Sequence, residues 1–570
     1  MGATEREPPT TREPARPLIR RLVWVRRFSQ AAFFALFCYL LCKTTFRGTF
    51  AASVAPVRLP VPVEGFFFAD PLAALLTLLS THTVYRGLLW SLAVVVLTAL
   101  LGRVFCGWIC PLGSLHHFVG WLWPSRYGKG ARRIAQNRAH PLRQRVKHYL
   151  LYAALGAAAL GSAVGGLLDP ISLAVRSLAV AVLPAAQYAV RAATGAAEGT
   201  GLRSVQTASG AVSDLLAATL WPARQAYFYG GWLIGALFVA LLVLGRFVPR
   251  FWCRVLCPLG ALLGALSRFS LLGLEKRQER CTSCNDCLLH CQGADSPEGG
   301  VPWRQHDCHV CLNCEAACPE GAIRFRFLPR LRDAERTPDV VRRTALASAA
   351  AGAVLVPLLR ASGGLDRGRD PRLIRPPGAL DERALLERCI RCGECLKICP
   401  NGALHPALFE AGIEGLWTPL LIARLGYCEP SCVLCSDVCP TGALRKITEE
   451  DKLGLGRAPV RIGTAFVDRG RCLPWAMARP CTVCEEFCPT SPKAIWIEPA
   501  QEPARLPGPP GEPQRLATAA VGRPHVDPGR CIGCGACEHL CPVRGAPAIY
   551  VTSDGETRSR ASAILLGEGG

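Results

Sequence analysis

The sequence has 570 residues, 30 cysteines and a formal net charge of +22 at pH 7, and this length allows roughly three or four domains. A secreted disulfide scaffold is excluded, because such chains are short and rich in cysteine throughout, whereas 24 of these cysteines follow Cys257 in spaced groups of four. The charge does not indicate nucleic-acid binding, because the basic residues lie beside apolar runs and no recognition motif is present.

Residues 1–20 contain several prolines and mixed charge, and we expect them to be disordered. Residues 21–275 are expected to form a membrane domain of four helical spans, because each of four apolar stretches is near the roughly twenty residues that cross a bilayer. These stretches are 24–44, 84–105, 149–168 and 228–248. The three basic segments beside them fall on one side, which the positive-inside rule predicts to be the cytoplasm.

The membrane domain contains an internal repeat. FFADPLAALLTLLS at 67–80 resembles LLDPISLAVRSLAV at 167–180, and each copy leads to a helix that ends in a shared Cys-x-x-x-Cys-Pro-Leu-Gly pattern. Two copies in one orientation imply pseudo-twofold symmetry about the membrane normal. Cysteines four apart face the same way on a helix, and the following proline ends the turn. A candidate additional redox site is therefore formed by Cys106, Cys110, Cys253 and Cys257. The alternative is a pair of structural helix ends with unligated thiols.

Two further pairs of residues stand out in this half of the chain. Cys38 and Cys42 have no counterpart in the third span, and we interpret them as small buried hydrophobic residues. His116 and His117 follow the first Cys-x-x-x-Cys-Pro pattern and could carry protons in a quinone reaction. We favour the interpretation that they are ordinary interfacial side chains.

Residues 276–330 are expected to form a ferredoxin domain with two [4Fe–4S] clusters. Both cysteine runs have the spacing Cys-x2-Cys-x2-Cys-x3-Cys, in which three thiolates hold one cube and the fourth holds its neighbour. Zinc sites are built instead from paired Cys-x2-Cys knuckles. The predicted ligands are Cys281, Cys284, Cys287 and Cys318 for one cube, and Cys308, Cys311, Cys314 and Cys291 for the other.

Residues 331–365 form a linker that contains an apparent export signal. Arg342 and Arg343 precede the apolar residues 344–359, as in a twin-arginine signal. This apolar run is short for a span. We favour an uncleaved signal that serves as a fifth span and places residues 366–570 in the periplasm, while residues 276–330 stay in the cytoplasm. The alternative is a surface or buried helix in a wholly cytoplasmic tail.

Residues 366–570 are expected to hold four more [4Fe–4S] clusters, which makes six in the chain. Each terminal cysteine should bind a partner motif's cube, but spacing does not identify the partner. We favour nested pairing of the first motif with the fourth and the second with the third. Residues 500–526 are interpreted as an irregular excursion. The four motifs are Cys389, Cys392, Cys395 and Cys399; Cys428, Cys432, Cys435 and Cys439; Cys472, Cys481, Cys484 and Cys488; and Cys531, Cys534, Cys537 and Cys541.

These motifs resemble two known families. The membrane half, with its two Cys-x-x-x-Cys-Pro patterns, resembles the NapH family of membrane quinol dehydrogenase subunits, and is also similar to NosR-type proteins and a copper-oxidase assembly reductase. The last third resembles the NapG and MauM polyferredoxins. The resemblance implies a fusion of the two parts in the inner membrane, nested cluster pairing, quinol as electron donor and a periplasmic cytochrome or reductase as partner.

The predicted fold is a membrane helical bundle of four spans, with a fifth after the first ferredoxin, joined to small α+β ferredoxin-like domains. The sequence contains no nicotinamide or flavin fingerprint and no catalytic triad, so no catalytic residue is assigned. We therefore expect an electron carrier, a component of a quinol dehydrogenase, rather than an enzyme that transforms a substrate. Ligands alone do not fix the direction of electron flow. The alternative is a redox assembly or sensing factor for a metalloenzyme.

Overall fold

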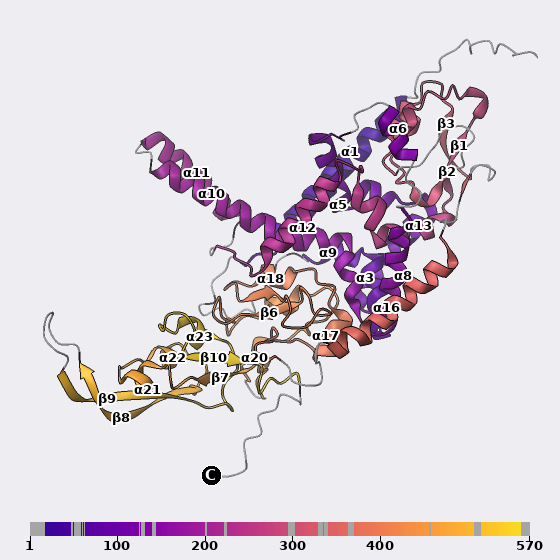
Figure 1. The fold of residues 1–570 in the computed structure, drawn as a ribbon. Helices are drawn as coiled ribbons and strands as arrows, with labels where there is room; N and C mark the ends of the chain where they lie inside the picture. The colour runs from indigo at the N-terminus through magenta and orange to yellow at the C-terminus, as the bar shows by residue number, and fades with distance from the viewer. Residues whose placement is uncertain are drawn as a thin grey trace, which may run out of the picture. The chain divides into compact units, whose positions relative to one another are not determined.

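The chain divides into two compact units, each of which combines part of the membrane half with one cysteine-rich part (Figure 1). Unit 1 comprises Met1–Leu40, Gly65–Ser177 and Gly235–Val356, and unit 2 comprises Leu41–Glu64, Leu178–Ile234 and Pro357–Gly570. A computed structural model describes all residues except 1–16, 47–49, 51–58, 60, 62, 125, 127–130, 139–143, 200–201, 220, 222–224, 294–302, 329–333, 336–339, 363–369, 455–457, 507–514 and 560–570.

Unit 1 is mainly helical, with a small ferredoxin domain near its end. Its helices are α1 (Pro17–Lys43), α2 (Gly65–Phe68), α3 (Pro71–Thr81), α4 (Ser91–Leu101), α5 (Pro111–Leu122), α6 (Ala131–Arg138), α8 (Val146–Ala159), α9 (Pro170–Ser177), α12 (Gly231–Leu244), α13 (Pro258–Leu266), α14 (Asp286–His290), α15 (Asn313–Ala317) and α16 (Arg342–Ser362). Three of these helices are shared with unit 2, because α1 and α16 end there and α12 begins there. In the ferredoxin, β1 (Leu272–Lys276) pairs antiparallel with β3 (Ile323–Phe327), and β2 (Trp303–Arg304) pairs parallel with β4 (Ala334–Glu335).

Three helical runs are long and apolar enough to cross a membrane: Pro17–Lys43, Pro170–Glu198 and Arg342–Arg360. The first matches the predicted span at 24–44, and the last contains the apolar run of the predicted fifth span. The other predicted spans correspond to the shorter helices α4, α8 and α12. The count of four spans is therefore not reproduced, although a membrane helical part is consistent with these helices. Residues 1–16 of the expected disordered segment lie outside the described residues, whereas residues 17–20 begin α1.

The second predicted span is shortened because α4 ends at Gly102, and the third because α8 ends just before Gly161, two glycines with positive φ. The Asp-Pro segments of the repeat lie outside these spans and begin buried helices of their own. Asp70 caps α3, where its carboxyl accepts from Leu72 N at 2.9 Å, and Asp169 caps α9, where it accepts from Ser172 N at 2.6 Å. Both aspartates are buried, and their carboxyl groups lie close enough to interact electrostatically. The sequence repeat is thus also a structural one, with its pseudo-axis between the two aspartates.

α16 packs against α8 through glycine. A β-carbon at Gly156 of α8 would collide with the carbonyl oxygen of Ala349 of α16, and a β-carbon at Gly352 of α16 would collide with that of Ala153 of α8. Small residues let helix backbones approach closely, which is the usual way for helices to associate in membranes. Most other side chains of α16 are exposed, so this reciprocal contact fixes the helix.

Unit 2 contains an exposed helical hairpin and the second cysteine-rich part, which is built from short elements. The helices are α10 (Leu183–Glu198), α11 (Arg203–Thr219), α17 (Glu382–Arg388), α18 (Glu394–Ile398), α19 (Leu434–Asp437), α20 (Glu449–Leu453), α21 (Leu473–Met477), α22 (Val483–Glu486) and α23 (Ala536–Leu540). The strands are β5 (Leu404–Pro406), β6 (Pro419–Leu421), β7 (Thr464–Val467), β8 (Ile495–Leu506), β9 (Arg515–Val526) and β10 (Ile549–Thr552), paired antiparallel as β5 with β6, β7 with β10 and β8 with β9.

The predicted irregular excursion at 500–526 is wrong. Most of this segment belongs to the hairpin of β8 and β9, in which Ile495 pairs with Val526 and Leu506 with Arg515. Its prolines, such as Pro503 and Pro524, suggested a loop. In a two-stranded sheet both strands are edges, so a residue without an N–H group can face outward without breaking the ladder.

We expect Gly352→Leu to destabilise unit 1, because the added side chain forces α16 away from the backbone of α8. Overpacking of this kind costs about 1–3 kcal/mol. Thermal unfolding of the purified chain in detergent, followed by circular dichroism, should show a lower midpoint. The matched control is Ala350→Leu, an exposed position on the same helix. Equal midpoints for both variants would contradict the packing described here.

Candidate cluster-binding sites

The ferredoxin of unit 1 brings its eight cysteines together in the two predicted groups. The thiol of Cys287 interacts electrostatically with those of Cys318, Cys284 and Cys281. The corresponding group around Cys314 contains Cys311, Cys291 and Cys308. Each run therefore supplies three thiols to one group and its last thiol to the other, as the spacing predicted; their ligation to iron stays a prediction.

The four motifs of the last third pair in sequence order, so the nested pairing is wrong for these thiols. Cys439 lies with the first motif and Cys399 with the second, while Cys541 lies with the third and Cys488 with the fourth. The four groups are Cys389, Cys392, Cys395 and Cys439; Cys428, Cys432, Cys435 and Cys399; Cys472, Cys481, Cys484 and Cys541; and Cys531, Cys534, Cys537 and Cys488.

The physical reason is local packing. α18 of the first motif lies against α19 of the second, and α22 of the third against α23 of the fourth. Each pair of motifs forms one ferredoxin-like unit with two groups of four thiols. The second and third motifs, which have the longer spacings between cysteines, therefore belong to different pairs. The long segment between the second and third motifs therefore joins two ferredoxins.

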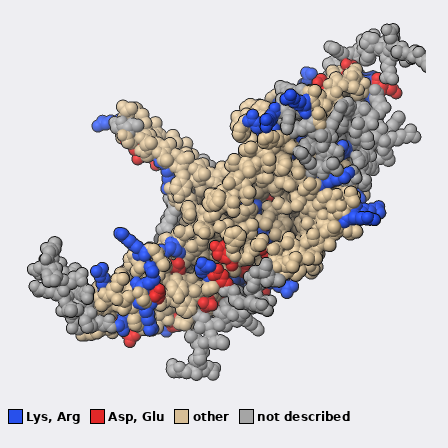
Figure 2. Space-filling view, viewed as in Figure 1, with Lys and Arg blue, Asp and Glu red and all other residues tan. Residues whose placement is uncertain are grey.

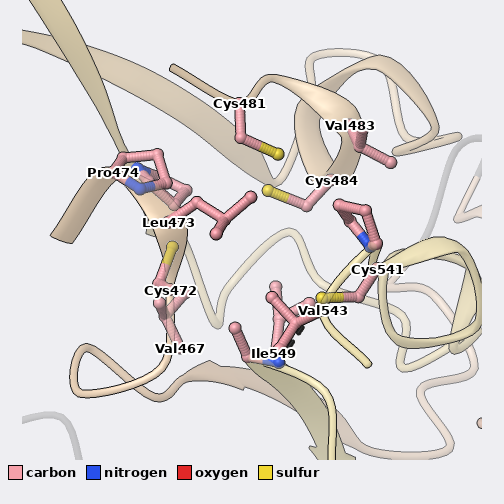
Figure 3. Close-up of a pocket in the computed structure, with 13 residues that line it drawn as sticks. Val467, Cys472, Leu473, Pro474, Cys481, Val483, Cys484, Cys541, Val543 and Ile549 are labelled. Atoms are coloured by element: carbon pink, nitrogen blue, oxygen red, sulfur yellow. Dashed lines mark hydrogen bonds between the residues drawn. The ribbon is translucent and has the colours of Figure 1, made fainter. Parts of the chain in front are cut away.

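One of the groups surrounds a small apolar cavity (Figure 3). Cys472, Cys481, Cys484 and Cys541 direct their sulfur atoms toward its interior, and side chains such as Leu473 and Val543 complete the wall. Among the described residues, no three metal-binding side chains come close enough to share a single ion. A four-iron cube binds each thiolate to a different iron, and the four thiols around this cavity could supply those ligands.

Backbone amides are directed at the terminal sulfur atoms. Ala403 N donates to Cys399 Sγ at 3.3 Å, Leu444 N to Cys439 Sγ at 3.4 Å and Ala548 N to Cys541 Sγ at 3.4 Å. These donors recur because the chain turns back over each Cys-Pro. Hydrogen bonds to ligand sulfurs are one of the factors that set the potential of an iron–sulfur cluster.

One cluster site has a buried cation beside it. Lys452 of α20 is 2% exposed, and its ammonium donates to Cys428 Sγ at 3.1 Å and to the carbonyl of Cys432 at 2.8 Å. Burial alone would lower the pKa of Lys452, but the thiols of Cys428, Cys432 and Cys435 together outweigh burial and raise it. Lys452 therefore stays charged against this group of thiols. The position of Lys452 in the sequence, between the second and third cysteine motifs, did not predict its contact with Cys428.

The four thiols of the membrane repeat also come together. Each Cys-x-x-x-Cys lies on a π-helical turn, Phe105–Ile109 or Trp252–Leu256, a distortion that is common at functional sites. These turns end at Cys110 and Cys257, directly before the prolines, as the sequence predicted, and Pro111 and Pro258 each also begin a new helix. Electrostatic interactions link the four thiols Cys106, Cys110, Cys253 and Cys257 to one another.

Two buried arginines flank this site symmetrically. Arg103 and Arg250 stand three residues before Cys106 and Cys253, and each reaches across to the other repeat. Arg250 Nη2 donates to the carbonyl of Gly113 at 3.0 Å, and Arg103 lies beside Gly260, the equivalent of Gly113. Two cations beside four thiolates would offset the charge of a bound cluster. The repeated arginine was visible in the sequence, but it could be recognised only once the thiols were seen to converge.

Arg103 also joins the repeat to the ferredoxin. Its Nη2 lies 3.9 Å from Cys106 Sγ, and its Nη1 donates to the carbonyl of His306 at 2.9 Å. The next residue, Asp307, forms an ion pair with the buried Lys147. Burial would raise the pKa of Asp307, but Lys147, His306 and Arg103 together outweigh burial and hold the pKa well below its usual range. Because Cys308 follows directly, one buried ionic network connects the four-thiol site with a ferredoxin cluster site.

A glycine lets the ferredoxin loop pack closely against the first copy of the repeat. A β-carbon at Gly107, inside the first Cys-x-x-x-Cys, would collide with the carbonyl oxygen of His309. The neighbouring Trp108 Nε1 donates to the carbonyl of Val310 at 3.0 Å. The second repeat has Arg254 in place of Gly107, so the ferredoxin loop packs on the first repeat at this position.

Cys38 and Cys42 lie half-buried on α1.

Paired four-thiol groups of this kind define an iron–sulfur electron-transfer protein of the ferredoxin type. A family model described as a 4Fe-4S binding domain matches residues 83–130 and 230–276, and another of the same description matches 386–405 and 524–544. The first match includes the four thiols of the membrane repeat. No solved structure matches the chain.

Curated relatives identify the family. The ferredoxin-type protein NapG of Escherichia coli is 36% identical over 181 residues, which are 31% of this chain and 69% of NapG. MauM of Paracoccus denitrificans, a methylamine utilization ferredoxin-type protein, is 34% identical over 37% of this chain and 87% of MauM. The putative electron transport protein YccM of E. coli is 25% identical over 47% of this chain and 64% of YccM. The chain belongs to the NapG and MauM family of ferredoxin-type proteins.

We expect Lys452→Met to lower the reduction potential of the cluster at Cys428, Cys432, Cys435 and Cys399, because a nearby cation stabilises the more negative reduced state. A hydrogen bond to a charged group is worth about 1.5–3 kcal/mol, which corresponds to a shift of about 60–130 mV for one electron. Redox titration followed by EPR would measure the shift. The other clusters of the same variant serve as internal controls, and Lys452→Arg should retain most of the wild-type potential. An unchanged potential in Lys452→Met would contradict the assignment.

Proposed function

We propose that the chain takes electrons from quinol in the membrane and passes them through its ferredoxin and the four-thiol site of the repeat to the four clusters of its last third. A periplasmic cytochrome or reductase would receive them there. The observation that carries this proposal is the buried network in which Arg103 lies beside Cys106 and donates to the loop that bears Cys308. A network that joins two candidate redox sites favours electron transfer over a purely structural role.

A second observation supports opposite locations for the two cysteine-rich parts. Unit 1 contains the basic segments that the positive-inside rule places in the cytoplasm, together with the first ferredoxin. Unit 2 contains the last third together with Leu41–Glu64 and Leu178–Ile234, which include loops predicted to lie on the other side. Within unit 2, Lys397 Nζ donates to the carbonyl of Thr44 at 3.0 Å, and Tyr229 N donates to His405 Nδ1 at 3.2 Å. This grouping supports a periplasmic last third, with α16 as the crossing.

The surface of unit 1 supports a membrane location. Figure 2 shows Lys and Arg side chains gathered over the start of α1, and a wide surface with few charged side chains over α5 and α12. Trp121 of α5 and Val239 of α12 are among the large apolar side chains of these helices that are exposed, at 74% and 56%. Exposed tryptophan beside a charge-free surface is typical of the membrane interface.

The residues of the chain supply the surroundings that electron transfer needs. A bound [4Fe–4S] cluster stores one electron, and the buried thiols hold it away from water. Backbone amides, Lys452 and the pair Arg103 and Arg250 place positive charge or donors beside the sulfur atoms, which favours the reduced state. The family relatives are named as ferredoxin-type proteins, and YccM as a putative electron transport protein; both names agree with this role.

The proposal is tested with the purified full chain in lipid nanodiscs under anaerobic conditions. Addition of a short-chain ubiquinol or menaquinol should reduce the clusters, which EPR of rapidly frozen samples would detect. Oxidised quinone serves as the negative control, and dithionite gives the total reducible signal. If dithionite reduces the clusters but neither quinol does so on the turnover timescale, electron flow from quinol is contradicted, and the assembly or sensing role becomes the better account.

A further inference from the structure

Unit 1 contains a cavity of about 460 Å³ between the membrane repeat and the ferredoxin. Its walls come from α5, from the end of α12 and the turn after it, and from the loop that follows α14. Small-molecule sites usually have volumes of about 300–1,000 Å³. All the described residues that line it belong to unit 1, so the walls are placed with respect to one another.

The walls bring a redox site and proton acceptors together. Cys291, the thiol grouped with Cys308, Cys311 and Cys314, lines the cavity, and so do His116 and His117 of α5. His116 is only 5% exposed, and its imidazole makes no hydrogen bond to another described residue. A buried imidazole with open hydrogen-bonding capacity faces a space that can hold a ligand.

Charge keeps these imidazoles neutral. Burial, with the nearby Arg250 guanidinium, lowers the pKa of His116 to about 4. Burial, followed by Arg250, Arg26 and Arg27, lowers the pKa of His117 to about 3. Both rings are therefore neutral at pH 7 and can accept a proton. Arg27 and Arg250 also line the cavity, where they would stabilise an anion formed by loss of that proton.

The cavity breaks the symmetry of the repeat. His116 and His117 follow Cys110 by six and seven residues, and the same positions after Cys257 hold Leu263 and Gly264. A β-carbon at Gly264 would collide with the carbonyl oxygen of His306, so the ferredoxin loop fills the second repeat's version of this space. The histidines therefore occur only where the space is open, which a merely structural role of the helix would not require.

We propose that this cavity binds the ring of a membrane quinol beside Cys291, with His116 and His117 as the proton acceptors of its oxidation. The inference rests on the proposed function and adds a location to it. It also replaces the interpretation of these histidines as ordinary interfacial side chains. Trp121 and Trp123 at the cavity wall are 74% and 49% exposed, which suits an entrance from the membrane interface for a molecule with an apolar tail.

The chemistry balances with two protons and two electrons. Both O–H bonds of the quinol break, and each proton forms an N–H bond with one imidazole before it passes to water. Two electrons leave the ring one at a time and reduce the two oxidised [4Fe–4S] clusters of residues 276–330 by one electron each. The product is the quinone, which returns to the membrane.

The test uses the full chain in nanodiscs with two readouts, a binding measurement and cluster reduction. An azidoquinone photolabel mapped by mass spectrometry should mark α5 or residues 289–292. Gly120 of α5 lines the cavity and has nothing within 4 Å of an added β-carbon, so Gly120→Phe should fill the space without distorting the helix. We expect at least tenfold weaker labelling and at least tenfold slower reduction by quinol, with an unchanged EPR signal after dithionite. The matched control is Gly210→Phe on α11, where an added β-carbon also meets nothing within 4 Å.

The histidines are tested by the double variant His116→Gln and His117→Gln. Labelling should stay within about threefold of wild type, while reduction by quinol slows at least tenfold, because glutamine can hydrogen-bond the ring but cannot take its proton. Labelling elsewhere in the chain, or wild-type rates in Gly120→Phe, would overturn the site. Labelling of the cavity that Gly120→Phe abolishes, without any cluster reduction in wild type, would support the site and contradict the proposed electron flow from quinol.

Discussion

A buried ionic network between the membrane repeat and the ferredoxin is the contact on which the rest of unit 1 depends. Arg103, Lys147 and Asp307 are all nearly inaccessible to water, and an isolated charge at such a depth would cost several kcal/mol. Asp307 forms ion pairs with both cations, and these contacts fix the loop before Cys308 against the helix end that bears Cys106. The network can form only when the helix end that bears Cys106 lies beside the loop that bears Cys308. It therefore holds these two candidate redox sites close together.

The repeat supplies a symmetric frame that the chain then uses asymmetrically. Paired elements meet at the pseudo-axis: the aspartates that cap α3 and α9, the arginines before each Cys-x-x-x-Cys, and the four thiols themselves. The ferredoxin then packs on the first copy at Gly107 and on the second copy at Gly264, and it leaves a cavity beside His116 of the first copy. A symmetric group of four thiols and an asymmetric cavity can therefore be built from the same repeated unit.

The sequence predicted features that depend on neighbours in the chain. In residues 276–330 the last cysteine of each run joins the thiol group of the other run. This could be predicted because the two runs are adjacent in the sequence and no third run lies nearby. With four motifs, the partner depends on which short helices pack together, and spacing does not record that contact. The Asp-Pro segments were recognised as a repeat, but only the fold shows that they begin short buried helices that bring Asp70 and Asp169 together. Lys452 reaches Cys428 only through the fold.

The most direct measurement of the central claim, that the four thiols of the repeat relay electrons between the two cysteine-rich parts, is cluster reduction by quinol in Cys253→Ser. Freeze-quench EPR with wild-type spectra assigned to each part would follow both sets of clusters in nanodiscs. We predict that the two ferredoxin clusters of unit 1 are reduced as in wild type, whereas the four clusters of the last third stay oxidised. Reduction of the last third at the wild-type rate would contradict the relay.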